Sequence, residues 1–240
     1  MKHIVKNPEP PTFIAWKEHH RYAIEQKSQE VTNMDVVWEM LPSKPPRPET
    51  EVEDATPYSK DELRRALLEE QGYLCCYCTR SISDSHTTKL DHFLPKEKSK
   101  YPHLVFSYEN LLACCDGGER DTDKPRELYC DAKKGKSDPT KPIQVVSPFQ
   151  SDCEAFFEFD ELGKIHAKDG DEGASKTIQF FGLDARALNT LRSAAIEVYI
   201  LEILSDDMDT SAAIAALRQK VAGKFEPFCT AIISVLRHYP

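Results

Sequence analysis

Residues 73–98 read YLCCYCTRSISDSHTTKLDHFLPKEK and contain the residues that decide how this chain folds. Cys75 and Cys78 form a Cys-x2-Cys pair, the spacing with which one turn of backbone brings two thiolates to a tetrahedral Zn²⁺. Further along, Asp91 and His92 are adjacent in a short β-like segment, and neighbouring residues of a strand point to opposite faces. The stretch therefore predicts a metal-binding knuckle followed by a strand that carries a carboxylate and an imidazole.

The cysteines of the chain are clustered rather than scattered. Six of the eight lie within 56 residues, namely Cys75, Cys76, Cys78, Cys114, Cys115 and Cys130. Such clustering in a reducing compartment favours metal ligation by thiolates over disulfides. The candidate second pair is Cys130 with either Cys114 or Cys115. The charged segment between the two members of this pair can loop outward. We therefore expect a four-cysteine structural zinc site with a long insertion in its second knuckle; buried free thiols are the alternative.

The chain outside this region divides into an arm and a helical region. Residues 1–58 carry half of the sixteen prolines and read as an arm and connector with one helix over residues 12–30. Ser59 and Glu62 form a capping box for a helix that ends at Gly72. Strands are expected over residues 89–94 and 104–107, and residues 59–150 are the expected core. From about residue 175 apolar residues recur at helical spacing, so residues 151–240 are predicted to be mostly helical.

Composition limits the possible classes of protein. The 240 residues are 40% hydrophobic and 30% charged, and no apolar run approaches the roughly 18 residues that a membrane helix needs. The N-terminal residues lack the apolar stretch of a secretory signal, so a cytoplasmic protein without membrane association is expected. The formal net charge of −9 argues against coating of nucleic acid by bulk electrostatics, although lysines at 96, 98, 100, 133, 134 and 136 allow a local positive surface.

Taken together, the motifs resemble a known family. Cys-x2-Cys, Asp-His-x-x-Pro, Tyr-x-Asn-Leu and Cys-Asp-x-Lys-Lys-Gly, spread over residues 75–135, look like the motif of the HNH (ββα-metal) nucleases. The inserted second knuckle and the proline-bearing arm are similar to the PtuB-like HNH subunit of Septu anti-phage systems, which also occurs as a retron effector. The resemblance implies an α+β fold, with a ββα-metal core and zinc knuckles embedded in a mostly helical chain.

The resemblance also implies a role for particular residues. His92 would be the general base, and Asn110 would hold the loop between the two strands and so fix His92. Asp91 and Asp131 would bind a catalytic Mg²⁺ or Mn²⁺, with Asp131 at a position where the family usually has Asn or His. The family's spacing favours Cys115 over Cys114, so the implied zinc ligands are Cys75, Cys78, Cys115 and Cys130. Lys133 or Lys134 could hold backbone phosphates, with a helix-surface role as the alternative.

The chemistry requires residues of these types. Phosphodiester hydrolysis develops negative charge that a divalent cation stabilises, and a neutral imidazole can take the proton from water. The predicted activity is that of an HNH endonuclease in an anti-phage defence complex, with nucleic acid as substrate; DNA is favoured and RNA, such as a tRNA, remains open. A zinc-ribbon binding module without catalysis is the alternative from another class. The resemblance further implies an ATPase partner, with or without a retron reverse transcriptase and its DNA. Residues 1–58 and 175–240 are a candidate docking surface; the alternative is that the C-terminal helices simply complete the hydrophobic core.

Overall fold

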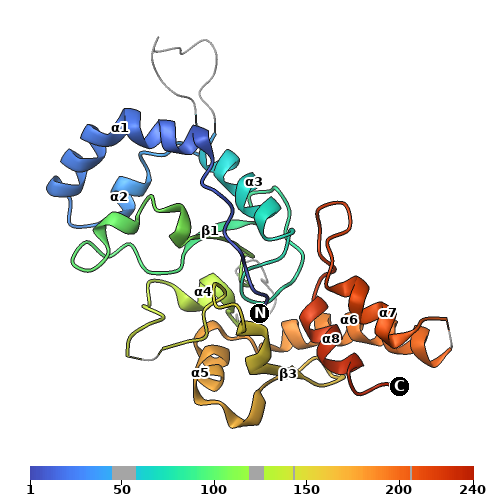
Figure 1. The fold of residues 1–240 in the computed structure, drawn as a ribbon. Helices are drawn as coiled ribbons and strands as arrows, with labels where there is room; N and C mark the ends of the chain where they lie inside the picture. The colour runs from blue at the N-terminus through green and yellow to red at the C-terminus, as the bar shows by residue number, and fades with distance from the viewer. Residues whose placement is uncertain (45–57, 119–126, 143, 206) are drawn as a thin grey trace.

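The computed structural model describes residues 1–44, 58–118, 127–142, 144–205 and 207–240. Within these residues the chain combines helices with two small antiparallel sheets, which is consistent with the predicted α+β class. The helices are α1 (Pro11–Glu30), α2 (Asp35–Trp38), α3 (Lys60–Glu70), α4 (Cys130–Lys134), α5 (Glu172–Phe181), α6 (Arg186–Leu204), α7 (Thr210–Leu217) and α8 (Cys229–Leu236). Figure 1 shows α1 and α2 in blue at one end of the molecule and α6, α7 and α8 in orange and red at the other.

The strand of the Asp-His pair belongs to a two-stranded hairpin. β1 (Lys89–His92) pairs antiparallel with β2 (Leu111–Cys114), so that Asp91 lies opposite Leu112 and His92 opposite Leu111. Every residue of β2 is buried, which fits its three apolar side chains and its one cysteine, Cys114. The hairpin therefore places the Asp-His pair and Cys114 on neighbouring strands, with Cys115 directly after β2.

The predicted second strand over residues 104–107 is wrong. This segment forms turns instead, with a 3-10 helix over Pro102–Leu104 and another over Tyr108–Asn110 immediately before β2. Pro102 lacks a backbone N–H and has a fixed φ, both of which suit the first turn of a helix better than a paired strand. The strand prediction followed local β propensity, whereas the partner of β1 is the fully buried run that begins at Leu111.

The expected helix after Ser59 is confirmed as α3. The Ser59 hydroxyl accepts a hydrogen bond from the Glu62 backbone N–H, and the Ser59 side chain is buried. The N-terminal residues run along this helix, where the Lys6 ammonium forms an ion pair of 2.6 Å with Glu70 and donates to the Leu111 carbonyl. Through Lys6 the N-terminal arm therefore contacts both α3 and the hairpin.

The C-terminal region is helical as predicted, with one addition. A second hairpin, β3 (Phe157–Phe159) with β4 (Ile165–Ala167), precedes α5 and packs against α8 and α5. Each strand has three residues, too few for a period-two pattern to be recognised in the sequence. Buried apolar side chains from the arm, the first hairpin and the C-terminal helices join one core cluster.

Two predicted features fall wholly or partly outside the described residues. Most of the proline-rich connector does so, over residues 45–57, as does the middle of the knuckle insertion, over residues 119–126. In the part of the chain that the structure describes, each helix is too short or too polar to span a lipid bilayer.

Candidate metal centre and active site

The clustered thiols meet beside the hairpin. Cys75, Cys114, Cys115 and Cys130 are buried, and their four sulfur atoms all lie within 4.8 Å of one another. The Cys75 sulfur is 3.6 Å from that of Cys114 and 3.8 Å from that of Cys130. Four sulfurs at about 2.3 Å from a tetrahedral Zn²⁺ would be about 3.8 Å apart, so the cluster has the dimensions of a site that could hold a metal such as zinc.

This group differs from the predicted ligand set in one member. It contains the predicted Cys75, Cys115 and Cys130, but it has Cys114 where the spacing argument has Cys78. Cys78 is nevertheless adjacent, because its sulfur lies 3.9 Å from the Cys115 sulfur. Five thiols are therefore available within a small volume for four positions around one cation.

The protonation of these thiols depends on their neighbours. Burial raises the pKa of Cys114 and Cys130 well above the ordinary value for a thiol. Burial acts in the same direction on Cys75, but hydrogen bonds from the surrounding thiols outweigh it and lower the pKa of Cys75 well below the ordinary value. Several buried thiolates would repel one another without a positive charge among them, and a bound cation removes that cost.

The backbone at Cys130 has an unusual conformation. Its φ of 55° is in the left-handed region, which a residue with a side chain adopts only when its surroundings hold it there. Cys130 begins α4, a helix of five residues, and its sulfur joins the thiol cluster. The next residue, Asp131, lines a separate pocket, so this turn of backbone connects the two sites.

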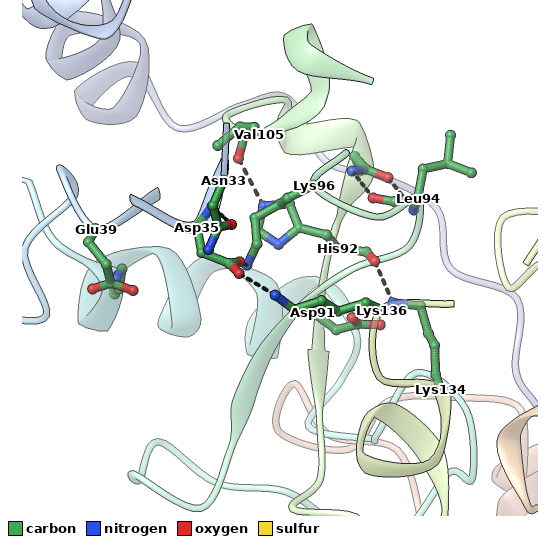
Figure 2. A network of polar contacts seen from close by, with 12 residues as sticks. Asn33, Asp35, Glu39, Asp91, His92, Leu94, Lys96, Val105, Lys134 and Lys136 are labelled. Carbon is green, nitrogen blue, oxygen red and sulfur yellow. Dashed lines mark hydrogen bonds and ion pairs between the residues drawn. The ribbon is translucent and has the colours of Figure 1, made fainter. Parts of the chain in front are cut away.

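Asp91 is buried at 3% exposure, and both of its carboxylate oxygens have partners within the chain. The Tyr77 hydroxyl donates to Oδ2 at 2.5 Å, and the Lys134 ammonium lies 2.7 Å from Oδ1. Lys134 also donates to the His92 carbonyl at 2.6 Å, as Figure 2 shows. The Asp91 carboxylate is therefore already in contact with a buried positive charge.

His92 is held by its ring nitrogen and by an aromatic neighbour. Its Nε2 lies 2.9 Å from the Val105 carbonyl oxygen, and the Trp38 ring packs perpendicular to the imidazole at 4.6 Å. Because a carbonyl can only accept, Nε2 carries the proton and Nδ1 is left with a free lone pair. Burial, together with the nearby Lys96 charge, lowers the pKa of His92 to about 3, so the ring is neutral at physiological pH.

Asn110 connects the two ends of the loop between the strands. Its side-chain oxygen accepts from the Leu94 N–H at 2.8 Å, and its amide donates to the carbonyls of Leu94 and Leu104 at 3.0 and 3.4 Å. Leu104 immediately precedes Val105, whose carbonyl contacts His92. Asn110 thus holds the segment that follows His92 and the segment that supplies its hydrogen-bond acceptor.

Asp91, His92, Asp131 and Lys134 line a common pocket of about 510 Å³. Asp91 and Asp131 are two of the four carboxylates that line it, with Asp35 and Glu97, and carboxylate oxygens are ligands that suit the Mg²⁺ or Mn²⁺ that the resemblance implies. Lys133, in contrast, is exposed and lines another cavity, beside α5. Of the two lysines proposed for phosphates, only Lys134 is in the Asp-His pocket, and there it is buried in an ion pair.

Sequence reasoning did not identify several residues around this pocket. Tyr77 and Trp38 contact Asp91 and His92 directly, and Asp35 at the start of α2 joins Lys96 and Lys136 at the pocket. The arm gave no sign of this in its sequence, because the contacts join residues more than fifty positions apart. Tyr77 lies between Cys76 and Cys78 in the sequence, but a single tyrosine at such a position does not indicate a contact with Asp91.

The chain is similar in sequence to a known protein. No protein-family model matches the chain. The chain is 28% identical over 151 residues to a protein of Vibrio cholerae serotype O1 biovar El Tor named "Retron Vc95 putative HNH endonuclease". The match covers 60% of this chain and 68% of that protein. This similarity, with the four-cysteine cluster and the mixed fold, supports a nuclease of the HNH type.

Proposed function

We propose that this protein is a metal-dependent HNH endonuclease that hydrolyses phosphodiester bonds of nucleic acid, with DNA as the favoured substrate. One observation carries the proposal: a neutral imidazole, fixed by the Val105 carbonyl with Nδ1 unprotonated, shares a pocket with the carboxylates of Asp91 and Asp131. The succession of two antiparallel strands and a short helix, with a thiol cluster between them, supports the same assignment.

In this proposal the chain's own residues position the reaction and move one proton. His92 Nδ1 accepts the proton of the attacking water, while Nε2 stays bonded to the Val105 carbonyl and fixes the plane of the ring. The Trp38 ring prevents the imidazole from tilting away. Asp91 and Asp131 would hold the divalent cation, which when bound supplies positive charge to the phosphate oxygens. Lys134 holds the Asp91 carboxylate in place through their ion pair.

The cysteine cluster has a structural role in the proposal. The four thiolates would hold a Zn²⁺ ion, which would join the segment of Cys75, strand β2 and the start of α4. Because Asp131 follows Cys130 directly, the same cation would set the position of Asp131 in the pocket.

The test is a cleavage assay with a matched pair of histidine variants. Purified protein is incubated with supercoiled plasmid DNA, or in a parallel arm with total tRNA, with and without Mg²⁺ or Mn²⁺. We expect divalent-dependent cleavage that His92→Ala reduces at least about a hundredfold. His103→Ala, which changes an exposed histidine near the same hairpin, should retain wild-type activity. Cleavage that persists in His92→Ala excludes His92 as the base.

A defence role is part of the proposal, supported by the retron named for the Vibrio relative. The proposed partner is an ATPase subunit that docks on the N-terminal arm or the C-terminal helices. Several apolar side chains of α6 are exposed, among them Val198 and Leu201 at 53% and 60%, which supports the C-terminal choice. Co-expression with an ATPase encoded by a neighbouring gene, followed by pull-down, tests this docking surface. Charged substitutions at Val198 and Leu201 should abolish the complex. A complex that forms unchanged would exclude this face of α6 from the interface.

A further inference from the structure

Asp35 connects two lysines from separate parts of the chain. The Lys96 ammonium lies 3.0 Å from one Asp35 oxygen, and the Lys136 ammonium lies 2.7 Å from the other. Lys96 follows β1, Lys136 follows α4, and Asp35 is the first residue of α2. Figure 2 shows the three side chains converging beside Asp91 and His92. Each oxygen of one carboxylate is therefore matched to a different ammonium group.

The three residues belong to the pocket of the proposed base. Asp35, Lys96 and Lys136 line it together with His92 and Asp131. Trp38, at the other end of α2, contacts the His92 ring, and the Lys96 ammonium lies 5.7 Å from the centre of the Trp38 ring. The short helix α2 thus extends from the proposed base to the lysine pair, which puts the pair within the reach of a polymer lying in the pocket.

The geometry of this group suits a phosphodiester. A phosphodiester carries one negative charge shared by two non-bridging oxygens, as a carboxylate does, and two ammonium groups facing two oxygens satisfy either anion. The two lysines lower the pKa of Asp35 to about 2 against the effect of its partial burial, so the carboxylate remains charged. The chain itself therefore shows that this place accepts a monoanion with two oxygens.

The Asp35 carboxylate can be displaced from the lysines at low cost. The Lys136 side chain is 84% exposed and that of Asp35 34%, and ion pairs in such exposed surroundings contribute little to stability. The backbone of Asp35 is held separately, because its N–H donates to the Asn33 side-chain oxygen. Rotation of the Asp35 side chain would free both lysines without moving α2 away from His92.

We propose that Lys96 and Lys136 form a subsite for a backbone phosphate adjacent to the one that is cleaved, and that the Asp35 carboxylate occupies this subsite in the free protein. The inference rests on the proposed nuclease function for the identity of the ligand. In this arrangement Asp35 is an internal competitor of nucleic acid. It weakens non-specific binding of any polyanion that lacks further contacts in the pocket.

The test compares two substitutions that remove the same charge. Asp35→Asn is isosteric and leaves Lys96 and Lys136 without an anionic partner. Glu39→Gln is the matched control, since Glu39 also pairs with a lysine, Lys60, at 2.7 Å, but neither residue lines the pocket. Binding of a fluorescent 20-base-pair DNA duplex and of an RNA hairpin is measured by anisotropy without added divalent cation, so that cleavage does not interfere.

We expect Asp35→Asn to tighten binding about five- to tenfold for at least one of the two polymers, and Glu39→Gln to change it less than about twofold. The larger gain identifies the nucleic acid that the pocket accepts. The salt dependence of Asp35→Asn should be steeper by about one unit in a plot of log Kd against log salt, because the subsite then has one more net positive charge. In the Asp35→Asn/Lys136→Ala protein the gain should disappear.

Two results would overturn the subsite. The first is that Asp35→Asn binds nucleic acid no more tightly than Glu39→Gln does. The second is that the double variant Asp35→Asn/Lys136→Ala keeps the gain in affinity. The single variant Lys136→Ala, which alters an exposed side chain, should weaken wild-type binding about two- to threefold and serves if Asp35→Asn does not fold. The subsite and the nuclease function fail separately. If Asp35→Asn does not tighten binding, but the protein cleaves nucleic acid in a way that depends on His92, the subsite alone is rejected. If Asp35→Asn tightens binding, but the protein cleaves neither DNA nor RNA, the hydrolytic function alone is rejected.

Discussion

At the scale of single residues, the Asp91–Lys134 pair is the least expected feature of the pocket. The side chains are 4% and 2% exposed, and the ammonium also donates to the His92 carbonyl. Removing one member of a buried pair leaves an uncompensated charge and costs several kcal/mol, whatever the net contribution of the intact pair. Lys134 therefore acts through Asp91 and the backbone of His92, and it is a positioning residue rather than a surface contact for phosphate.

A lysine-to-methionine exchange separates these roles. Lys134→Met keeps the apolar stem and removes the ammonium, and we expect the free energy of unfolding to fall by about 3 to 5 kcal/mol in buffer without divalent cation. Addition of Mg²⁺ should recover part of the loss, because the released Asp91 oxygen gains a cation. Lys133→Met, at the exposed neighbouring position, should change stability by less than about 0.5 kcal/mol. Urea unfolding measures both, and equal stability of the two variants would contradict the buried pair.

The buried His92 makes stability depend on pH. An unfolded chain binds a proton at this residue as the pH falls through about 6.5, whereas the folded chain does so only near pH 3. The unfolded state therefore binds more protons between these values, and stability falls as the medium becomes more acidic. Between pH 7.5 and pH 5 we expect His92 to account for a loss of about 2 kcal/mol.

The measurement is urea unfolding of the wild type, His92→Gln and His103→Gln at both pH values. His92→Gln should lack this part of the slope, and His103→Gln should keep it. A His92→Gln protein with the wild-type slope would show that another group titrates in this range.

At this scale the sequence indicates candidate site residues only where the chemistry is concentrated in adjacent residues. The Asp91-His92 pair was recognisable from its neighbours in the chain. Its partners were not, because Trp38 and Val105 reach His92 only after the arm and the loop have folded around it. Neither residue type suggests such a role on its own.

At the scale of elements, helices were predictable because their signals are local. The Ser59 cap marks the start of α3, and apolar spacing marked the C-terminal helices. The second strand was misplaced because a strand is completed by its partner, and the choice between residues 104–107 and Leu111–Cys114 depends on which segment can be buried beside β1. Pro102, which favours the first turn of a helix, was the signal in the sequence against a strand over residues 104–107.

The loop between β1 and β2 depends on Asn110. Asn110→Ala removes one acceptor and two donors and leaves backbone groups of Leu94 and Leu104 without partners, so we expect a loss of about 3 kcal/mol in unfolding free energy. The Val105 carbonyl should lose its fixed position as well, and kcat should fall while nucleic-acid affinity is retained.

The control is Asn33→Ala, which removes a single hydrogen bond at an exposed position and should cost less than about 1 kcal/mol. Measurement of unfolding and of cleavage in parallel distinguishes loss of the fold from loss of His92 orientation. An Asn110→Ala protein with wild-type kcat at a temperature where it is folded would separate Asn110 from the placement of the base.

At the scale of the whole molecule, the thiol cluster is the point where distant parts of the chain meet. Cys75 follows α3, Cys114 and Cys115 are at the end of β2, and Cys130 begins α4, with a long insertion between the last two. The cysteine spacing predicts that these segments come together, with Cys78 as a ligand and Cys115 rather than Cys114. The four grouped sulfurs instead include both Cys114 and Cys115, because the path of the backbone turns and not the spacing decides which thiols meet.

Metal content then becomes the measurement that links the cluster to the fold. We expect one Zn²⁺ per chain, lost in Cys75→Ser, Cys115→Ser and Cys130→Ser, each with a cooperative loss of structure because binding of the ion is coupled to folding. The sulfur positions add Cys114→Ser to this group, while Cys229→Ser, a buried cysteine on α8 outside the cluster, should keep its metal. Zinc retained by Cys114→Ser and lost by Cys78→Ser would restore the ligand set given by spacing. Zinc retained by all the single variants would mean that the thiols are a packed core, and α4 would then need another explanation for the position of Asp131 in the pocket.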